Sequence, residues 1–341
     1  MKDREGEVRS TLSRWLDVEE DKIKTSLVSN ETAHFRFLFK VPEKPFVYRK
    51  LMRAMSWLIL KTPYNSRYNA TTHLKEFRRL VCKSSKPSLS LCNSERVVEL
   101  GNWIGSKPKW NNKKFVVCMT HDIDYRGCYE FAPELLELDE SHGIKSCWNF
   151  LADGPYTVDK RVLDRLEDNG HEIGLHGLEH DIAFGFRDHA TIRECIKSSL
   201  SKLGITPRGF RAPALSYSRE LLEVLHELGF SYDSSIPDRD LGLCYPYRIP
   251  GKRLWEIPVT TPQDSELIRD WNLSQDEAFK LLKSKIETIK RLHGVAVLLF
   301  HPCIIKKNVR LYEQLLEHIN SLSDCWVTTP KELICHLEKR R

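Results

Sequence analysis

Beyond residue 115 the chain repeats one pattern, in which a short apolar run is followed by a segment with apolar residues at helical spacing. The runs are rich in β-branched and aromatic residues, and the clearest of them are FVVCMT, KSCWNFL, HEIGLH and VAVLLFH. Parallel strands need a crossover connection, which is usually a helix. The alternation therefore predicts an α/β fold with a parallel sheet, either closed or nearly closed into a (β/α) barrel or, as the alternative, open and doubly wound.

Five segments between these runs are predicted to form helices. Their apolar residues recur three and four positions apart, which places them on one helical face. Thr191, Ser218 and Ser274 stand near the starts of three segments and belong to the residue types that cap helix N-termini. The predicted helices span residues 158–167, 190–203, 218–228, 274–292 and 310–322.

Residues 1–110 lack this alternation and are predicted to form an N-terminal α+β extension, an accessory region whose role the sequence does not indicate. Helices are expected around residues 12–16 and 48–60, and a strand with one buried face at 34–41. A connector rich in Ser, Lys, Pro and Asn precedes residue 113. We place the domain boundary there, so that residues 111–341 form the catalytic barrel.

The predicted helix at 48–60 carries an apolar stripe with two interpretations. Met52, Met55, Trp57 and Leu58 could pack against the main domain, which is the more common use of such a stripe. The alternative is that they face a membrane or a partner.

The charge balance gives little support to a nucleic-acid-binding function. The chain has 53 basic and 47 acidic residues, a formal net charge of +6, and only short basic clusters. A mildly positive surface tolerates anionic polysaccharides or lipid headgroups without requiring them. We expect no nucleic-acid partner, and the sequence identifies no partner protein.

The apolar runs and the cysteine spacing predict the cellular location of the protein and the state of its thiols. Its start has no apolar core of the secretory type, and no apolar run is long enough for a transmembrane segment. The 10 cysteines are scattered without a CxxC pair, which favours buried, reduced thiols over a disulfide framework. We therefore expect a cytoplasmic protein.

His176 and His180 are candidate metal ligands. They are four positions apart, so on a helical turn both imidazoles would project from one face and converge on one ion. The chain has 13 histidines, so such a pair also arises by chance. Its place at the end of a strand-like run, beside glycines that permit close backbone approach, favours the metal site.

Asp122 and Asp124 follow another apolar run. Residues two apart on a strand face the same side, so both carboxylates can enter one pocket. One could complete a site of two histidines and one carboxylate with positions left open for water and substrate, while the other accepts a proton. The alternative is an Asx-type cap or a surface ion pair.

Arg211, in FRAP, and His301, after VAVLLF, also stand where apolar runs end. Parallel α/β proteins bind ligands at the C-terminal ends of their strands, so these residues can share a site with the aspartates. Taken singly, Arg211 could be a surface charge and His301 a satisfied core histidine.

The ordered motifs Asp-x-Asp, HxxxH, Arg-x-Pro, Tyr-Asp-Ser-Ser and a leucine-rich strand ending in His resemble the polysaccharide deacetylase family. This is carbohydrate esterase family 4, with its NodB homology domain, here in a THDxD-type variant. The resemblance covers roughly residues 113–335. It implies a distorted (β/α) barrel of seven or eight units.

The resemblance also implies a role for each matching residue. His176, His180 and one aspartate, which we assign as Asp124, would hold the metal, and Asp122 would be the base. Arg211 would orient that base, and His301 would protonate the leaving amine. The other implied positions are Asp233, which tunes the acid histidine, Leu299, which lines the acetyl pocket, and Pro213 and Ala214, beside a backbone N–H that contacts the oxyanion.

The implied reaction is removal of an N-acetyl group from an amino sugar or a cell-surface glycan precursor by metal-activated water. Zn²⁺ is the expected metal, with Co²⁺, Ni²⁺ or Fe²⁺ as alternatives. Two other functions stay open: hydrolysis of a non-sugar amide or cyclic imide at the same metal site, and a catalytically silent carbohydrate-binding protein. Motifs of P-loop, dinucleotide-binding and serine hydrolase enzymes do not occur.

Overall fold

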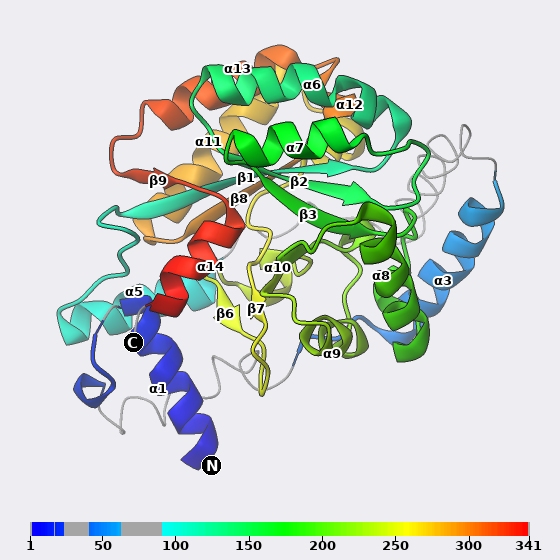
Figure 1. Cartoon of the computed structure of the whole chain (residues 1–341). Coiled ribbons are helices and arrows are strands. Elements are labelled where there is room, and N and C mark those ends of the chain that lie inside the picture. Colours follow the sequence, from blue (N-terminus) through cyan, green and yellow to red (C-terminus); the bar gives the residue numbers. More distant parts are fainter. Residues whose placement is uncertain (1, 17, 24–40, 63–90, 340–341) are drawn as a thin grey trace.

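The computed structural model of the chain describes residues 2–16, 18–23, 41–62 and 91–339 (Figure 1). Most of the strand predicted at 34–41 lies outside these residues. One sheet dominates the described part, and its strands run in the order β6-β7-β5-β4-β3-β2-β1-β8, with β9 also paired to β1. Their bounds are β1 (Phe115–Ile123), β2 (Ser146–Leu151), β3 (Glu172–Gly177), β4 (Gly209–Phe210), β5 (Tyr232–Asp233), β6 (Tyr247–Arg248), β7 (Trp255–Glu256), β8 (Val295–Phe300) and β9 (Cys325–Val327).

The strand order is that of a distorted barrel. Each strand from β1 to β5 lies beside its predecessor, and β8 returns to pair with β1, as the last strand of a barrel does. All pairings are parallel except that of β6 with β7. Side-chain hydrogen bonds link the segment after β7 to β8, because the hydroxyls of Thr260 and Thr261 donate to the carbonyls of Val295 and Val297 over 2.9 Å each. The barrel prediction is therefore confirmed.

The outer layer consists of helices, and the five predicted ones are present within two residues of their expected ends. Ser218 and Ser274 cap their helices as predicted, and Ser274 forms a full capping box with Glu277. Thr191 is not a cap: it lies inside its helix, and the side chain of Asp188 accepts its N–H. The helices are α6 (Arg126–Ser141), α7 (Lys160–Asp168), α8 (His189–Leu203), α9 (Arg219–Glu227), α10 (Asp238–Leu241), α11 (Gln275–Arg291), α12 (Pro302–Ile305), α13 (Val309–Asn320) and α14 (Pro330–Lys339).

Helix α6 was not predicted from the sequence, and it contains Pro133 in its interior. This helix packs against the sheet partly through a buried polar network. The side chain of His121, on the outer face of β1, lies 3.0 Å from the carboxylate of Asp139 on α6, which also accepts a hydrogen bond from the hydroxyl of Tyr312 over 2.5 Å. His121 therefore points away from Asp122, because successive side chains on a strand face opposite sides.

The N-terminal helices attach to the barrel at two places. Near the starts of the strands lie α1 (Lys2–Leu16) and α5 (Cys92–Ile104), whereas α3 (Phe46–Lys61) lies on the side to which the arrowheads of β1–β3 point (Figure 1). Trp15 of α1 contributes to the barrel's core, and its indole N–H donates to the carbonyl of Pro246 over 2.7 Å. The accessory region thus shares apolar core with the barrel.

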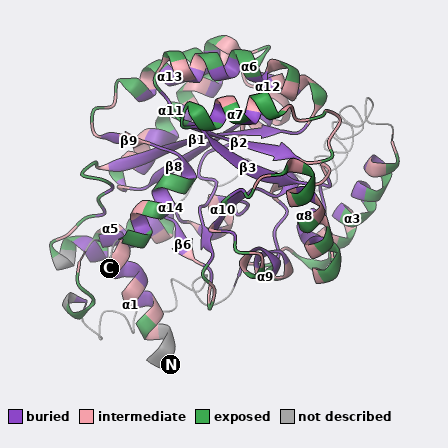
Figure 2. Ribbon diagram, in the orientation of Figure 1, coloured by how far each residue is buried: buried purple, intermediate pink, exposed green. Residues whose placement is uncertain are grey.

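The sheet that the helices cover is the most buried part of the structure (Figure 2). The sheet is buried on both faces, as Figure 2 shows, and every residue of β1 is buried. The described cysteines are unpaired, but the thiol prediction holds only partly, because Cys92 and Cys335 are exposed. Within the described ranges, none of the helices has the length and apolar character to cross a bilayer.

Candidate active site

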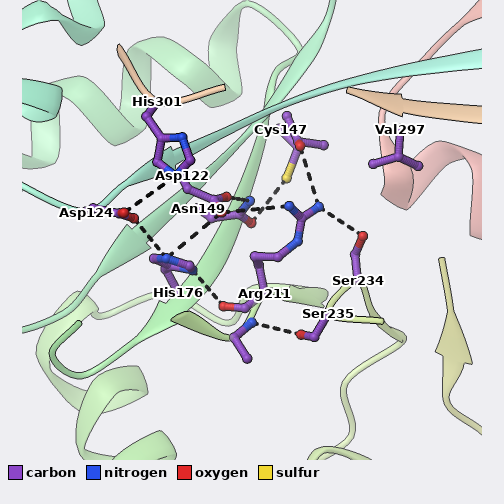
Figure 3. Close-up of polar contacts among 12 residues, drawn as sticks. Asp122, Asp124, Cys147, Asn149, His176, Arg211, Ser234, Ser235, Val297 and His301 are labelled. Carbon is purple, nitrogen blue, oxygen red and sulfur yellow. Dashed lines mark hydrogen bonds and ion pairs between the residues drawn. The ribbon is translucent and has the colours of Figure 1, made fainter. Parts of the chain in front are cut away.

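Asp122 is the eighth residue of β1, and Asp124 follows the strand's last residue. Both side chains face the interior of the barrel at the C-terminal edge of the sheet, where Figure 3 shows them converging with His176, Arg211 and His301. The carboxylates of Asp122 and Asp124 are both buried. The alternation of strand side chains thus brings two acids into one pocket.

The histidine pair reaches this pocket by a route that the sequence did not indicate. His176 is part of β3, and His180 lies in the loop that follows, so the prediction of a shared helical turn is wrong. The chain turns at Gly177, whose φ of 109° is strongly disfavoured for residues with a side chain. This turn returns His180 towards His176, so that their ring centroids are 5.7 Å apart.

Asp124, His176 and His180 form a group able to hold a metal ion. Nε2 of His176 is 3.0 Å from Oδ1 of Asp124, and Nε2 of His180 is 3.1 Å from Oδ2 of the same residue. One potential ligand atom from each residue lies within 4.8 Å of the others. Oδ1 of Asp124 is buried without a hydrogen-bond partner, a state that a bound cation would relieve.

The protein orients these ligands for a cation. Nδ1 of His176 lies 2.7 Å from the carbonyl oxygen of Arg211, so that nitrogen carries the proton and Nε2 is left for metal. Burial alone would raise the pKa of Asp124, but the neighbouring His180, His301 and His176 hold it well below its ordinary value. Asp124 is therefore ionised, as a ligand must be. Two imidazoles and a carboxylate are a donor set that suits zinc and related divalent ions.

Asp122 lies beside this group and has other partners. Its Oδ2 is 4.0 Å from Nε2 of His176 and 3.7 Å from Nη1 of Arg211. Its Oδ1 accepts a hydrogen bond of 2.8 Å from the side-chain amide of Asn149 on β2. The guanidinium and the amide donor together hold this carboxylate in one orientation.

Arg211 follows β4 and is almost completely buried, so its charge requires compensation. Its Nη2 donates to the hydroxyl of Ser234 over 2.9 Å, which fixes the plane of the guanidinium. Its main-chain carbonyl holds His176 at the same time. One residue thus positions both a metal-ligand candidate and the candidate base.

His301 begins the segment after β8 and is paired with an acid that the sequence analysis did not name. Its Nδ1 lies 2.6 Å from Oδ1 of Asp264, and its main-chain N–H donates to Oδ2 of the same residue over 2.7 Å. Its Nε2 faces the pocket, 3.5 Å from Oδ2 of Asp124. Burial lowers the pKa of His301, but the charges of Asp264 and Asp124 outweigh it and raise the pKa to about 9.

Asp233 was expected to tune His301. In the structure it forms a buried pair of acids with Glu256, close enough to Arg211 to feel its charge. It is the strand neighbour of Glu256, and its Oδ1 accepts a hydrogen bond of 2.6 Å from the hydroxyl of Ser235. Burial raises the pKa of Asp233 to about 6, and burial together with the charge of Asp233 raises that of Glu256 much further. Burial thus favours the protonated form of both carboxyl groups, and the pair can share a proton.

The residues expected to contact the substrate lie in the segment after β4 and on β8. Pro213 and Ala214 belong to a short 3₁₀ segment (Pro213–Leu215), in which Ala214 is exposed and has a left-handed φ of 54°. The N–H of the preceding Ala212 donates to the hydroxyl of Ser235 over 2.8 Å. Leu299 is buried on β8, two residues before His301 and therefore on the same side of the strand.

Asn149 and Asp264 are the functional candidates that the sequence analysis missed. Asn149 gave a signal, because it is a lone amide within an apolar strand. Asp264 gave none: it lies 37 positions before His301 and immediately precedes a π-helical segment (Ser265–Asp270) that no periodicity indicated.

Comparisons with known proteins agree with this geometry. Residues 109–232, a little over a third of the chain, match the polysaccharide deacetylase family. The peptidoglycan deacetylase-like protein FGM2 of Gibberella zeae is 33% identical over 83 residues, 24% of this chain and 25% of that protein. The peptidoglycan deacetylase of Helicobacter pylori is 25% identical over 111 residues, 32% of this chain and 38% of that protein. The chain thus matches less than half the length of either curated relative.

Solved structures share the fold. A putative polysaccharide deacetylase from Mycobacterium smegmatis superposes with a TM-score of 0.59 at 20% identity, over 67% of this chain and 92% of that one. A probable polysaccharide deacetylase from Pseudomonas aeruginosa gives a TM-score of 0.56 at 16% identity, over 68% and 95% of the two chains. PuuE allantoinase gives a TM-score of 0.55 at 18% identity, over 68% and 94%.

Proposed function

We propose that the protein is a metal-dependent hydrolase that removes the N-acetyl group of an amino sugar or glycan. The observation that carries this proposal is the convergence of three kinds of group in one pocket. Asp124, His176 and His180 offer a cation three ligands, Asp122 stands beside them with its own donors, and His301 faces them from β8. The match of residues 109–232 to the polysaccharide deacetylase family supports an acetylated sugar as the substrate.

In this site a divalent cation such as Zn²⁺ would polarise the acetamide carbonyl and make water more acidic. Asp122 accepts the proton from the attacking water, since Asn149 and Arg211 hold its carboxylate beside the metal-ligand group. His301 is protonated at neutral pH and donates from Nε2 to the departing amine, while Asp264 holds the opposite edge of its ring.

The remaining residues shape the cavity. The left-handed turn at Ala214 exposes the backbone at the rim, where a main-chain N–H can contact the oxyanion of the tetrahedral intermediate. Leu299 supplies an apolar surface for the acetyl methyl group. Arg211 acts through Asp122 and His176 and is a positioning residue in this scheme.

Hydrolysis of a panel of substrates tests the proposal. Acetate release is measured for N-acetylated mono- and oligosaccharides, an acetylated sugar-lipid intermediate and a simple acetamide, and ring opening to the amido acid is measured for a cyclic imide. Wild type should release acetate from a sugar, whereas Asp122→Asn and His176→Ala should lose at least about 10²-fold in kcat. His189→Ala on the surface of α8 is the matched control and should retain full activity. Equal activity of all four proteins refutes the mechanism, and turnover of the imide alone refutes the sugar assignment.

A further inference from the structure

All of the large apolar side chains that the described residues expose lie on one helix. They are Phe46, Val47, Trp57 and Leu58 of α3, with exposed fractions of 63%, 76%, 54% and 52%. Single exposed apolar residues are common on protein surfaces, but a contiguous group confined to one element marks an interaction surface. Nothing in the proposed reaction accounts for these side chains.

The exposed side chains occupy the face of α3 opposite to its packing face. Met52, Met55 and Ile59 point inwards and pack against Ile182 and Phe186 of the loop after β3. The outward residues follow helical spacing and form what we name the α3 outer face: Phe46, Val47, Lys50, Ala54, Trp57, Leu58 and Lys61. The apolar stripe that the sequence left ambiguous is therefore divided between the two faces.

All charged residues of α3 are basic. Between residues 46 and 61 there is no acidic residue, whereas Lys50 and Lys61 are exposed on the outer face. The ammonium of Lys50 lies 4.5 Å from the ring centroid of Phe46, and that of Lys61 lies 3.8 Å from the ring of Trp57. Cationic and aromatic groups thus alternate along one strip.

We propose that the α3 outer face binds the surface of an anionic lipid bilayer. A protein partner would have to bury Lys50 and Lys61 among apolar groups, and lysine is depleted in the cores of such interfaces. At a bilayer surface the aromatic and aliphatic side chains enter the headgroup boundary, while the lysine stems extend outwards to lipid phosphates. A helix without acidic residues meets no repulsion there.

Hydrogen bonds join α3 to the loop after β3, the loop that contains His180. Nε of Arg53 donates to the carbonyl of Phe186 over 2.6 Å, and the hydroxyl of Ser56 donates to the carboxylate of Asp181, next to His180. The arrowheads of β1–β3 point towards the side on which α3 lies (Figure 1). Membrane docking through α3 would therefore hold the C-terminal edge of the barrel near the lipid surface, although the docking does not depend on the proposed reaction.

Flotation with vesicles tests this inference on the full chain. Wild type should float with vesicles of phosphatidylglycerol and phosphatidylcholine and stay unbound with phosphatidylcholine alone. Lys50→Glu/Lys61→Glu should lower the partition coefficient by more than about 25-fold, since each lysine contributes about fivefold. Phe46→Ser/Trp57→Ser should also abolish flotation. The matched control, Lys280→Glu/Lys283→Glu on α11, makes the same charge change at exposed positions away from α3 and should bind as wild type does.

Any one of three results overturns the inference. They are no binding of the wild type to anionic vesicles, binding of the α3 variants as strong as that of the wild type, and a loss of binding in the control variant equal to that in the α3 variants. If the wild type does not bind vesicles but forms a concentration-dependent dimer in light scattering, the α3 outer face is instead an interface with a second copy of the chain. Acetate release from a soluble acetylated sugar is measured in parallel and should be unchanged in the α3 variants, which also shows that they fold. Vesicle binding without acetate release would refute the proposed function and leave the inference standing.

Discussion

Asp264→Asn perturbs the proposed catalytic acid without touching a metal-ligand candidate. The carboxylate of Asp264 lies 2.6 Å from Nδ1 of His301, and its negative charge is the strongest of the influences that raise the pKa of that imidazole to about 9. An asparagine removes the charge, and it can accept only one of the two hydrogen bonds that His301 donates.

A close opposite charge shifts a pKa by about 1 to 3 units, so the pKa of His301 should fall to between about 6 and 8. The acid must be protonated to act, so activity is lost as pH rises through its pKa. The alkaline limb of kcat/KM should therefore move to lower pH in Asp264→Asn, and with a two-unit shift activity at about pH 8 should fall roughly tenfold.

The assay is acetate release from an acetylated sugar across the pH range, with metal content and thermal unfolding recorded for each protein. Asp276→Asn, an exposed change of the same charge in the first turn of α11, is the control and should leave the profile unchanged. An alkaline limb that stays in place in Asp264→Asn, in a folded and metal-loaded enzyme, would refute His301 as the acid that Asp264 tunes.

Asp122→Asn should retain metal and lose about 10²- to 10⁴-fold in kcat, whereas His176→Ala should lose metal as well, as elemental analysis of both variants would show. Gly185→Ala should destabilise the fold by about 1–3 kcal/mol in denaturant unfolding, because its Cβ would collide with a facing main-chain carbonyl; Gly6→Ala, with open space, should be neutral or stabilising. Burial raises the pKa of Glu172 from 4.5 to about 7, so the folded state holds this proton more tightly and stability should decline as pH rises between those values. Glu172→Gln should remove that decline and raise the free energy of unfolding at about pH 8 by about 3 kcal/mol; an unchanged pH dependence would contradict the assignment.

Sequence patterns predicted the barrel because its strands are buried on both faces. β8 is an unbroken apolar run, β1 begins with one (Phe115–Met119), and capping residues such as Ser274 mark helix starts locally. α6 was missed although its apolar residues have helical spacing, and its interior Pro133 disfavours a helix on local grounds. Tertiary packing and the buried contacts of Asp139 outweigh that local preference.

The site was predictable where its residues stand at strand ends and unpredictable where contacts join distant segments. Asp122, Asp124 and His301 follow apolar runs, so the common edge of a parallel sheet brings them together. The HxxxH spacing indicated a helix, but Gly177 supplies a sharp turn that gives the same convergence from a strand and a loop. The contact of Asp264 with His301 depends on how two segments 37 positions apart pack, which no local pattern encodes.

Metal stoichiometry tests the central claim most directly, because the proposed chemistry depends on the ligand group of Asp124, His176 and His180. Elemental analysis should find a stoichiometric divalent ion in the wild type, or after loading the chelated protein with Zn²⁺, and acetate release should disappear and return with that ion. His176→Ala/His180→Ala should bind none, whereas His189→Ala should bind as wild type does. A wild-type protein that binds no divalent ion, or a double variant that binds it equally well, would contradict the account.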